Sequence, residues 1–489
     1  MAQKTSIPDA VKEVVEKLQN AGFEAYIVGG CVRDLLRGEK PKDWDVTTSA
    51  HPEEIIKIFP ESFYENKFLT VTVKTGSEDQ TLREIEITTF RAEGKYTDKR
   101  HPDEIRFAKT LEEDLSRRDF TINAMAMDAE DNSTDPFEGQ ADLKKKIVRA
   151  VGEPEKRFDE DALRMMRGVR LATELNFTIE EETERAIKKL AGNLQFIAKE
   201  RIRDELVKII GTPHAREGIE LLHELGLLKF IIPELEEGIG VENRPRVFTI
   251  WEHNLKALEY GAKTKFPLDV KIAAMLHDAG KPRTKGPMKN NEWTFYGHDV
   301  VGSRMAAALL LRLHFPRETV EKISTLIRWH LFKYDPDEGI TDSSIRRLIR
   351  RVAPENMDDL VKLRICDRMG MGVPKAVPYR LRHFQFRVEK ILREEETPTP
   401  KMLKVNGDDI MKTLGIEPGP KVGHVLEVLL QEVIDEPVKN SRESLESRIK
   451  NLGKLEDKEL VKLAEDAESK VEMVEDERVS KIKQKYWVK

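Results

Sequence analysis

The strongest constraint on the fold of this chain is a change in hydrophobic periodicity near residue 141. Before it, apolar spacing predicts a helix over residues 8–20, a helix in CVRDLLRG, and short strands in AYIVGG, KDWDVTT, NKFLTVTVKT and REIEITTF. After it, one apolar stripe at helical spacing follows another. We therefore predict the α+β class, with a small mixed β-sheet head over residues 1–140 and an all-helical remainder.

Proline and glycine residues gather near 232–245 and 397–420, and these stretches are candidate domain boundaries. The length of 489 residues suggests about three domains at roughly 150 residues each. The last ~40 residues are charged with a helical period, which predicts a solvent-exposed helical tail.

Charge and composition exclude several classes of protein. The 83 Lys and Arg residues nearly balance 89 Asp and Glu residues, and the net charge of −6 excludes a globally basic, histone-like protein but allows a local basic strip. No apolar run approaches the ~20 residues that cross a bilayer, and the amphipathic N-terminus has no apolar signal core. Two cysteines, Cys31 and Cys366, cannot make a disulfide framework. We expect a cytoplasmic protein with reduced thiols, no membrane partner and no evident obligate protein partner.

Two aspartates one residue apart, Asp43 and Asp45, form the first candidate site. In a strand their side chains would point to the same face, where two carboxylates repel unless a cation lies between them. Ligation by oxygen alone suits Mg²⁺. Upstream, Gly29 and Gly30 lie between a predicted strand and a predicted helix, where glycines let backbone N–H groups approach a phosphate. The combination is more specific than either motif alone.

With these motifs the chain resembles the class II tRNA nucleotidyltransferase/poly(A) polymerase family over residues 20–240. GGCVRDLLRG followed by DWDVTT is similar to the first catalytic motif of that family, and RRDFTIN is similar to its second. EDALRMMR is similar to the base-reading motif, and KERIRDE to the helix-start motif that follows it. The resemblance implies a catalytic nucleotidyltransferase head over 1–140 and a helical neck that recognises the nucleotide base over 141–244.

Phosphoryl transfer depends on metal ions, positioning and charge neutralisation more than on covalent help from the protein. By two-metal logic, Asp43 and Asp45 are the predicted catalytic residues and shared Mg²⁺ ligands. Glu86 is a candidate third carboxylate, although Glu84 lies on the same predicted face. Guanidinium groups suit phosphate better than ammonium groups do. Together with the resemblance, this predicts nucleotide binding by Gly29, Gly30, Arg33, Arg117, Arg118, Asp119, Asn123, Asp161, Arg164, Arg167 and Arg170.

Asp161 and Arg164 stand three residues apart on a predicted helix, so we expect both side chains on one face. A carboxylate accepts from an amino group and a guanidinium donates to a ring nitrogen, which matches the Watson–Crick edges of cytosine and adenine. Uracil and guanine present the reverse order and would leave buried groups unpaired. We therefore predict that this pair selects CTP and ATP without a nucleic-acid template.

The segment FRAEGKYTDKRHPDEIRF, residues 90–107, is polar and has no periodic apolar pattern. The resemblance implies that this is the flexible loop needed to switch from C to A addition, a loop that looks truncated in enzymes that add only CC. Its full length here favours a complete CCA-adding enzyme.

A second set of candidate metal ligands comprises His253, His277, Asp278, His298, His330 and Asp367, although the whole chain holds only 11 histidines. Mixed imidazole and carboxylate ligation suits Mn, Fe, Ni, Co or Mg better than a thiolate zinc site does. The ordered set, with HDAGKP at its centre, resembles the HD phosphohydrolase domain. The resemblance implies that residues 245–370 bind a divalent transition metal or Mg²⁺ and hydrolyse phosphomonoesters or phosphodiesters.

Residues 344–404 form the most basic stretch, with 15 Lys and Arg against 8 Asp and Glu. Tyr379, Phe384 and Phe386 are interleaved with arginines, and basic residues beside aromatic rings suit phosphate backbone and unpaired bases. A basic helical face packed on its neighbours is an equal alternative. The predicted RNA-binding residues are Arg346, Arg347, Arg350, Arg380, Arg382 and Arg387. By resemblance, residues 371–489 form a helical body and tail that bind tRNA through its A-form shape.

The sequence thus predicts template-independent addition of CCA to tRNA 3′ ends from CTP and ATP. A poly(A) polymerase of the same family would use ATP alone, and it ranks lower because the motif expected of that branch does not follow the acidic pair. A protein whose main activity is HD hydrolysis predicts damage to Asp43, Asp45 or Asp161, and all three are intact. A pure RNA-binding module would need neither site.

Overall fold

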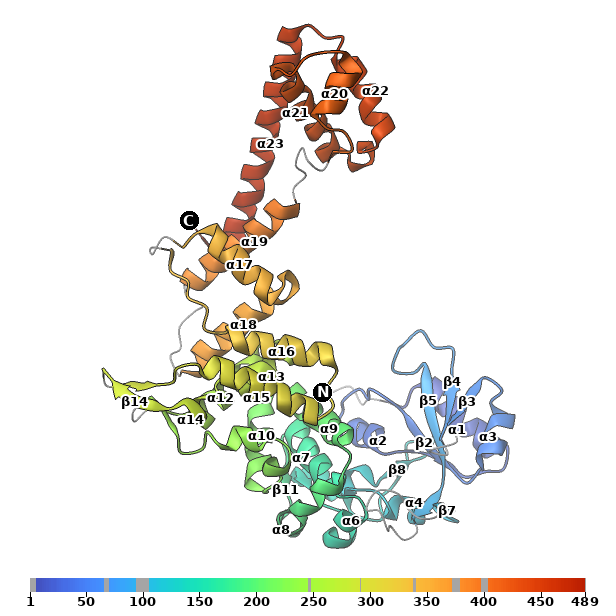
Figure 1. Ribbon diagram of the computed structural model, residues 1–489. Coiled ribbons are helices and arrows are strands. Elements are labelled where there is room, and N and C mark those ends of the chain that lie inside the picture. The colour runs from blue at the N-terminus through green and yellow to red at the C-terminus, as the bar shows by residue number, and fades with distance from the viewer. Residues whose placement is uncertain are drawn as a thin grey trace. The chain divides into compact units, whose positions relative to one another are not determined.

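The computed structural model describes residues 6–65, 70–93, 105–244, 248–290, 292–336, 340–371, 379–396 and 403–488. The chain divides into two compact units (Figure 1). Unit 1 comprises Met1–His330 and Lys362–Val373, and unit 2 comprises Leu331–Val361 and Pro374–Lys489. Among the helices in the described ranges, none combines the length and the apolar character that crossing a lipid bilayer requires.

A mixed seven-stranded sheet forms the head of unit 1, in the order β3-β4-β5-β2-β1-β8-β9. Its strands are β1 (Ala25–Val28), β2 (Asp45–Thr48), β3 (Ser62–Glu65), β4 (Thr70–Lys74), β5 (Glu84–Thr89), β8 (Ala126–Met127) and β9 (Ser133–Thr134). Within this sheet β2 and β5 run parallel, and their register pairs Asp45 with Glu86. The predicted mixed sheet is confirmed, while β3, β8 and β9 lie outside the strands that the sequence predicts.

Short helices and one hairpin complete the head. Helix α1 (Asp9–Asn20) packs its predicted apolar face into the same core as the sheet. Helix α2 (Gly30–Leu36) follows β1 directly, and the chain leaves it at Gly38, where a φ of +75° favours glycine. The other elements are α3 (Pro52–Ile58), α4 (Leu111–Ser116), and the hairpin of β6 (Arg91–Glu93) and β7 (Ile105–Phe107). Residues 94–104 of the predicted loop 90–107 lie outside the described residues.

The neck of unit 1 is helical, as predicted. It consists of α5 (Gly139–Lys145), α6 (Pro154–Glu160), α7 (Leu163–Leu175), α8 (Glu181–Leu190), α9 (Lys199–Gly211), α10 (Ala215–Glu224), α11 (Pro233–Glu236) and the short pair β10 (Ile147–Val148) and β11 (Thr178–Ile179). Helix α7 packs against α9 and α10. At Gly168 of α7 an added Cβ would lie 2.9 Å from the buried ring of Phe120, so this glycine lets the neck approach the head closely.

The last part of unit 1 is a helical layer with two hairpins. Its elements are β12 (Glu242–Arg244), β13 (Phe248–Thr249), α12 (Ile250–Lys263), α13 (Leu268–Leu276), α14 (Lys281–Thr284), β14 (Gly286–Lys289), β15 (Glu292–Thr294), α15 (His298–Arg312), α16 (Arg317–Trp329) and α18 (Met357–Gly370), of which the residues from 362 onward belong to this unit. Helix α13 packs between α12 and α16, and α16 packs on α15. Residues 272–276 of α13 are all apolar and buried, as expected for a helix covered on several sides.

Unit 2 contains α17 (Asp342–Val352), α19 (Tyr379–Glu396), α20 (Gly407–Leu414), α21 (Pro420–Asp435), α22 (Arg442–Leu452) and α23 (Asp457–Tyr486). The predicted helical tail is present as α23, and its described side chains are mostly exposed, but one narrow face of the helix is buried. Leu460 and Ala464 of α23 lie in the core that α20, α21 and α22 share, and Ile482 packs against Phe386 of α19. A few apolar residues are enough to pack α23 onto its neighbours, because only a narrow face of this helix is buried.

Gly280 should be intolerant of any side chain, because a Cβ there would lie 2.3 Å from the carbonyl oxygen of His298 and 2.5 Å from the backbone nitrogen of Gly302. We expect Gly280→Ala to lower stability by about 1–3 kcal/mol or more through overpacking. Thermal unfolding checks this, with Gly211→Ala as the control because no atom lies within 4 Å of its added Cβ. Equal midpoints for the two variants would contradict the packing described.

Candidate active site and metal centre

A polar cleft of about 430 Å³ lies between the sheet of the head and helices α7 and α9 of the neck. Its lining combines glycines, carboxylates and guanidinium groups. The lining residues are Gly29, Gly30, Asp45, Thr70, Glu86, Thr88, Arg91, Arg117, Arg118, Asp119, Asn123, Asp161, Leu163, Arg164, Arg167 and Arg201. Most of the predicted catalytic and nucleotide-binding residues are among them, so one cleft unites motifs that are far apart in the sequence.

Carboxylates gather at the β2–β5 side of the cleft, where Asp45 and Glu86 are in register. Burial raises the pKa of Asp45 to about 6, with Arg118 lowering it and the carboxylates of Asp43 and Glu86 raising it further. Such a group of carboxylates fits a divalent cation such as Mg²⁺, which would relieve their repulsion. Glu84 is not among the residues that line the cleft, so Glu86 is the better candidate for a third ligand.

Asp43 does not occupy the predicted position in the strand. Strand β2 begins at Asp45, and Asp43 lies in the bend before it with an exposed side chain. Between the two aspartates, Trp44 is 2% exposed and packs in the core of the head, and its carbonyl oxygen accepts from the N–H of Glu86 at 3.2 Å, so the pairing with β5 reaches Trp44. Asp43 remains close enough to raise the pKa of Asp45.

The turn between β1 and α2 brings backbone close to these charges. Gly29 has a φ of +83°, and a Cβ at this position would lie 3.1 Å from Nη1 of Arg118 and 3.4 Å from Oδ2 of Asp45. A side chain at this point would therefore be strained and would fill the space beside the carboxylate. Gly30, the first residue of α2, lines the cleft next to it.

The RRDFTIN motif supplies Arg117, Arg118 and Asn123 to the cleft. Its aspartate, Asp119, is already engaged: the side-chain nitrogens of Arg167 donate to its Oδ2 at 2.6 and 2.7 Å. Burial opposes ionisation of Asp119, but Arg167 and Arg164 lower its pKa to about 2. Asp119 therefore holds Arg167 in place from the head side of the cleft.

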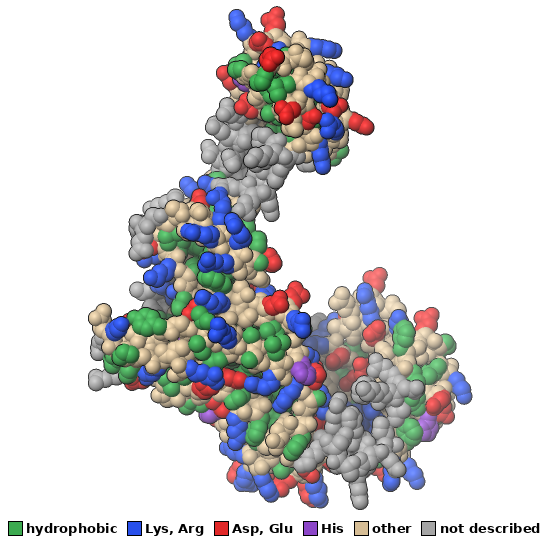
Figure 2. All heavy atoms as spheres, viewed as in Figure 1, with side chains coloured by type: hydrophobic (Ala, Val, Ile, Leu, Met, Phe, Trp, Pro, Cys, Tyr) green, Lys and Arg blue, Asp and Glu red, His purple; other side chains and the backbone are tan. Residues whose placement is uncertain are grey.

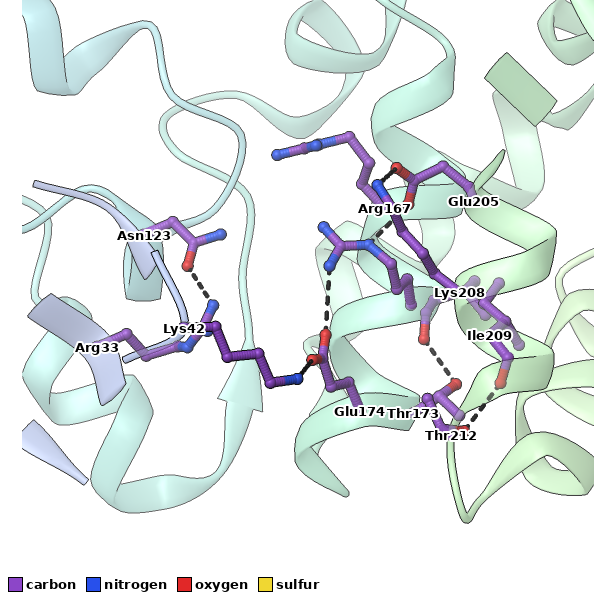
Figure 3. A network of polar contacts seen from close by, with 12 residues as sticks. Arg33, Lys42, Asn123, Arg167, Thr173, Glu174, Glu205, Lys208, Ile209 and Thr212 are labelled. Carbon is purple, nitrogen blue, oxygen red and sulfur yellow. Dashed lines mark hydrogen bonds and ion pairs between the residues drawn. The ribbon is translucent and has the colours of Figure 1, made fainter. Parts of the chain in front are cut away.

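Arg33 and Arg170 are predicted to bind nucleotide, but neither lines the cleft. Arg33 donates to the side-chain oxygen of Asn123 at 2.8 Å and so orients that amide (Figure 3). Arg170 pairs with Glu205 at 2.7 Å and with Glu174 at 3.2 Å, which ties α7 to α9. Neither arginine lines the cleft itself: Arg33 orients Asn123, which does line it, and Arg170 joins the two helices of the neck that border it.

Asp161 departs from the predicted helix. Helix α6 ends at Glu160, and Asp161 has extended backbone before α7 begins at Leu163. The turn still brings Asp161 and Arg164 into the same cleft. Asp161 pairs with Arg201 at 2.7 Å, while Arg164 pairs with Glu160 at 2.5 Å. Each of the two groups is thus held by a partner of its own.

Some lining residues escape sequence analysis. Arg201 belongs to the recognised motif KERIRDE, but its pairing with Asp161, 40 residues away, is a tertiary contact that no local pattern signals. Thr88 could have been found, because it lies two residues after Glu86 in β5 and therefore on the same face. Arg91 and Thr70, which begin β6 and β4, carry no such signal.

The six ligands of the second set converge in one buried centre of unit 1. Asp278 lies at its middle: the Nε2 atoms of His253, His277, His298 and His330 are 3.3, 3.5, 3.4 and 3.8 Å from its carboxylate oxygens. Asp367 of α18 approaches from the other side, with Oδ1 3.3 Å from His253 and 3.5 Å from His277. Two groups of three, His253–His277–Asp278 and Asp278–His298–His330, have the spacing to hold a metal ion.

Backbone carbonyl groups orient three of these imidazoles. The Nδ1 atoms of His277, His298 and His330 each lie 2.6–2.8 Å from the carbonyl oxygen three residues earlier. Donation from Nδ1 leaves each Nε2 with a lone pair directed at Asp278, which is how metal-binding histidines are usually fixed.

The charges of this centre also fit a cation. The ammonium of Lys281 lies 2.6 Å from Asp278. Burial lowers the pKa of His253, but hydrogen bonds to Asp278 and Asp367 raise it to about 9. Burial and the neighbouring His277 lower the pKa of His330 to about 3, so this imidazole is neutral, the form that binds metal. The buried carboxylate of Asp278 and the partly buried carboxylate of Asp367, among imidazoles, thus suit a divalent metal ion.

Four known domains match along the chain. The poly A polymerase head domain matches residues 25–149, and the "Probable RNA and SrmB-binding site of polymerase A" matches residues 176–239. The HD domain matches residues 250–369, and the tRNA nucleotidyltransferase domain 2 matches residues 380–449.

The CCA-adding enzyme of Ligilactobacillus salivarius is 32% identical over 456 residues, which cover 91% of this chain and 98% of that protein. The chain belongs to the CCA-adding tRNA nucleotidyltransferase family. Within the wider group, the A-adding tRNA nucleotidyltransferase of Deinococcus radiodurans is 33% identical over 418 residues, which cover 83% of this chain and 91% of that protein. The CCA-adding enzyme of Lactobacillus helveticus is 49% identical over 225 residues, which cover 45% of this chain and 55% of that protein.

The structure of the Bacillus stearothermophilus CCA-adding enzyme in complex with CTP is similar, with a TM-score of 0.59 and 28% identity over 91% of this chain and 96% of that one. The resemblance to the nucleotidyltransferase and HD families that the sequence predicts is therefore confirmed.

The predicted RNA-binding residues of this family member lie in unit 2. Arg346, Arg347 and Arg350 stand on α17, whose apolar face is buried. Figure 2 shows Lys and Arg side chains gathered over this part of unit 2. Arg347 and Arg350 are exposed on this helix, and Arg346 is half-buried.

For Phe384 and Phe386 the alternative of a helical face packed on its neighbours holds, because both rings are buried at 1% and 7% exposure. They serve the packing of α19: the ring of Phe384 stacks on Phe332 with centroids 4.5 Å apart. The neighbouring arginines also have partners within unit 2. Arg380 pairs with Asp335, Arg387 with Asp342, and Arg382 with the carbonyl oxygens of Tyr486 and Trp487.

We expect the purified protein to retain a divalent metal that depends on the HD centre. His277→Ala or Asp278→Ala should weaken metal affinity by at least about tenfold, because each removes a buried ligand. Elemental analysis after dialysis measures the bound metal, and the matched control is His214→Ala, a histidine outside the cluster. Full metal content in Asp278→Ala would show that the metal is bound elsewhere.

Proposed function

We propose that this protein adds CCA to the 3′ ends of tRNA, from CTP and ATP and without a nucleic-acid template. One observation carries the proposal: the cleft that contains Asp45 and Glu86 also contains Asp161 and Arg164. A cation-binding group of carboxylates and a base-matching pair thus share one cavity of nucleotide size. The relatives named CCA-adding enzymes, and the similar structure with CTP, support the assignment.

Mg²⁺ is the proposed cofactor, with Asp43, Asp45 and Glu86 as its ligands in a two-metal arrangement. When bound, it would lower the pKa of the attacking 3′-hydroxyl and neutralise charge on the triphosphate and the leaving pyrophosphate. The chain contributes the positions of Asp45 and Glu86 through the register of β2 and β5, and Asp43 lies in the bend just before β2. Arg118 adds a positive charge that favours the ionised form of Asp45.

The arginines of the RRDFTIN motif are the proposed triphosphate ligands. Arg117 and Arg118 enter the cleft from the end of α4, and a guanidinium can give two parallel hydrogen bonds to a phosphate. Asn123, oriented by Arg33, has the position and chemistry to bind a ribose hydroxyl. Arg167, held by Asp119, adds positive charge on the neck side.

Asp161 and Arg164 are the proposed base readers. The carboxylate would accept from the exocyclic amino group of cytosine or adenine, and the guanidinium would donate to the adjacent ring nitrogen. Arg201 and Glu160 hold the two side chains before a nucleotide arrives, so little conformational entropy is lost on binding. Uracil or guanine would leave these groups unpaired, which is the source of strong selection.

We also propose a role for each segment of the chain. Residues 1–140 catalyse transfer, residues 141–244 recognise the base, residues 245–370 form the HD domain, and residues 371–489 bind tRNA. In unit 2, Arg346, Arg347 and Arg350 of α17 are the best placed for RNA backbone. A cytoplasmic location fits this proposal, since Cys31 and Cys366 are free thiols.

Two other activities have a specific observation in their favour. The relative from Deinococcus radiodurans is named as an A-adding enzyme, so addition of the terminal A alone is a second candidate. The converging histidines and aspartates of the HD centre favour an additional phosphohydrolase activity on nucleotide or RNA phosphates.

The deciding experiment uses Mg²⁺ with two tRNA transcripts, one lacking CCA and one ending in CC, and each nucleotide supplied alone or in pairs. We expect two C and one A on the first transcript, one A on the second, and then a stop. Addition of A to the CC transcript alone would indicate the A-adding activity. Long A tails would indicate a poly(A) polymerase.

Asp45→Asn should reduce transfer by at least about 100-fold, because it removes a charged ligand without changing its shape. Asp278→Asn is the matched change in the HD centre and should leave transfer within twofold. Any phosphatase activity should respond in the opposite way. Loss of both activities in one correctly folded variant would contradict two independent sites.

Asp161→Ala should reduce discrimination against UTP and GTP by at least about 100-fold while leaving the Mg²⁺ requirement unchanged. Competition between labelled CTP and UTP measures this. Asp159→Ala, an exposed carboxylate two residues earlier, is the control. Undiminished selection against UTP in Asp161→Ala would refute base reading by this residue.

A further inference from the structure

A fully buried carboxylate, Asp114, lies behind the cleft and outside the motifs that predict the site. It belongs to α4, and its side chain has no exposed surface. A charge is costly to bury unless several hydrogen-bond donors surround it. The donors around Asp114 therefore indicate which groups this carboxylate holds in position.

Five donors converge on this one carboxylate. Oδ1 accepts from Nε and Nη2 of Arg117 at 2.9 and 2.8 Å and from the backbone N–H of Arg91 at 3.1 Å. Oδ2 accepts from the hydroxyl of Thr47 at 3.2 Å and from Nη2 of Arg118 at 3.4 Å. Burial alone would disfavour the charged form, but these arginines and the Arg91 N–H hold the pKa of Asp114 below its usual range.

The partners of Asp114 come from three parts of the head that meet at the cleft. Arg117 and Arg118 are adjacent like charges that line the cleft. Thr47 belongs to β2, two residues after Asp45, and Arg91 begins β6. One rigid carboxylate thereby fixes both guanidinium groups against the strand that carries the catalytic aspartate.

We propose that Asp114 is a positioning residue for nucleotide transfer: it neutralises the repulsion between Arg117 and Arg118 and aims both at the triphosphate. This role rests on the proposed function of the cleft. It predicts that loss of the carboxylate weakens nucleotide binding even when the fold survives, since unheld arginines must be ordered by each incoming nucleotide.

Another buried carboxylate provides a matched control. Asp142 of α5 is 4% exposed, accepts from the hydroxyl of Thr121 at 2.6 Å and pairs with Arg149 at 2.8 Å. Neither partner lines the cleft. Asp114→Asn and Asp142→Asn are therefore the same chemical change at carboxylates with the same kinds of partner. The difference is that arginine partners of Asp114 line the cleft, whereas the partners of Asp142 do not.

The test measures the KM for CTP, the KM for tRNA and direct binding of CTP to the full-length protein by calorimetry, with thermal unfolding alongside. Asp114→Asn should raise the KM and Kd for CTP about tenfold and leave the KM for tRNA within twofold, an effect typical of a lost charged hydrogen bond. Asp142→Asn should change both KM values less than twofold. Equal effects of the two variants on CTP binding would mean that Asp114 is only structural.

A second comparison keeps the test valid if Asp114→Asn is poorly folded. Thr47→Val removes, without a charge change, a hydroxyl whose one proton lies within reach of Asp114 at 3.2 Å and of the carbonyl oxygen of Thr88 at 3.3 Å, and we expect a two- to threefold rise in the Kd for CTP. In a protein that already carries Arg117→Lys and Arg118→Lys, adding Asp114→Asn should raise the Kd for CTP by less than a further twofold, because Asp114 acts through those arginines. A full tenfold additional loss there would overturn the proposal. If the wild type binds CTP but transfers none to tRNA, the proposed function fails while the binding comparison still decides the role of Asp114.

Discussion

Arginine side chains of the neck hold the head in place, and the shape of the cleft depends on them. Arg157 of α6 donates to the carbonyl oxygens of Ser116 and Arg117, and Arg167 of α7 pairs with Asp119. Charged donors meeting acceptors at one short segment give strong, directional contacts. Because that segment also carries Arg117 and Arg118, the proposed phosphate ligands, the contacts that join head and neck also set the distance between these arginines and the proposed base readers on the neck side.

The head could be predicted because its signals are local. Glycines after β1, the acidic pair at β2 and the arginine-rich motif each have a fixed spacing, and the mixed sheet follows from alternating apolar residues. The candidate HD ligands could be predicted because histidine is rare in this chain, and because His277 and His330 each follow a helical stripe with a buried end. In both cases residue type and spacing, together with the resemblance to known families, carried the information.

Tertiary packing decided the points that the sequence could not settle. Strand β2 starts at Asp45, and Asp43 lies in the bend before it, although the buried Trp44 between them fits the alternation of a strand. Arg201 reaches Asp161 only because α9 packs on α7. The sequence pattern of the rings of α19 and of the few apolar residues of α23 would be the same whether they faced solvent, RNA or one another. The structure shows that they pack together in one apolar cluster. A periodicity identifies an apolar face but not the partner that covers it.

The path of the chain through the two units has a consequence for assembly of the HD centre. His330 is the last residue of unit 1 before the chain leaves for unit 2, and Asp367 lies in the short return to unit 1. The final ligand therefore arrives only after residues 331–361 have been made and the chain has come back, which adds the entropy of closing that loop. During synthesis the four histidines and Asp278 can gather first, whereas the complete set of six requires a late, long-range closure. A metal ion bound by all six residues would hold the two ends of residues 331–361 together and stabilise the closed arrangement.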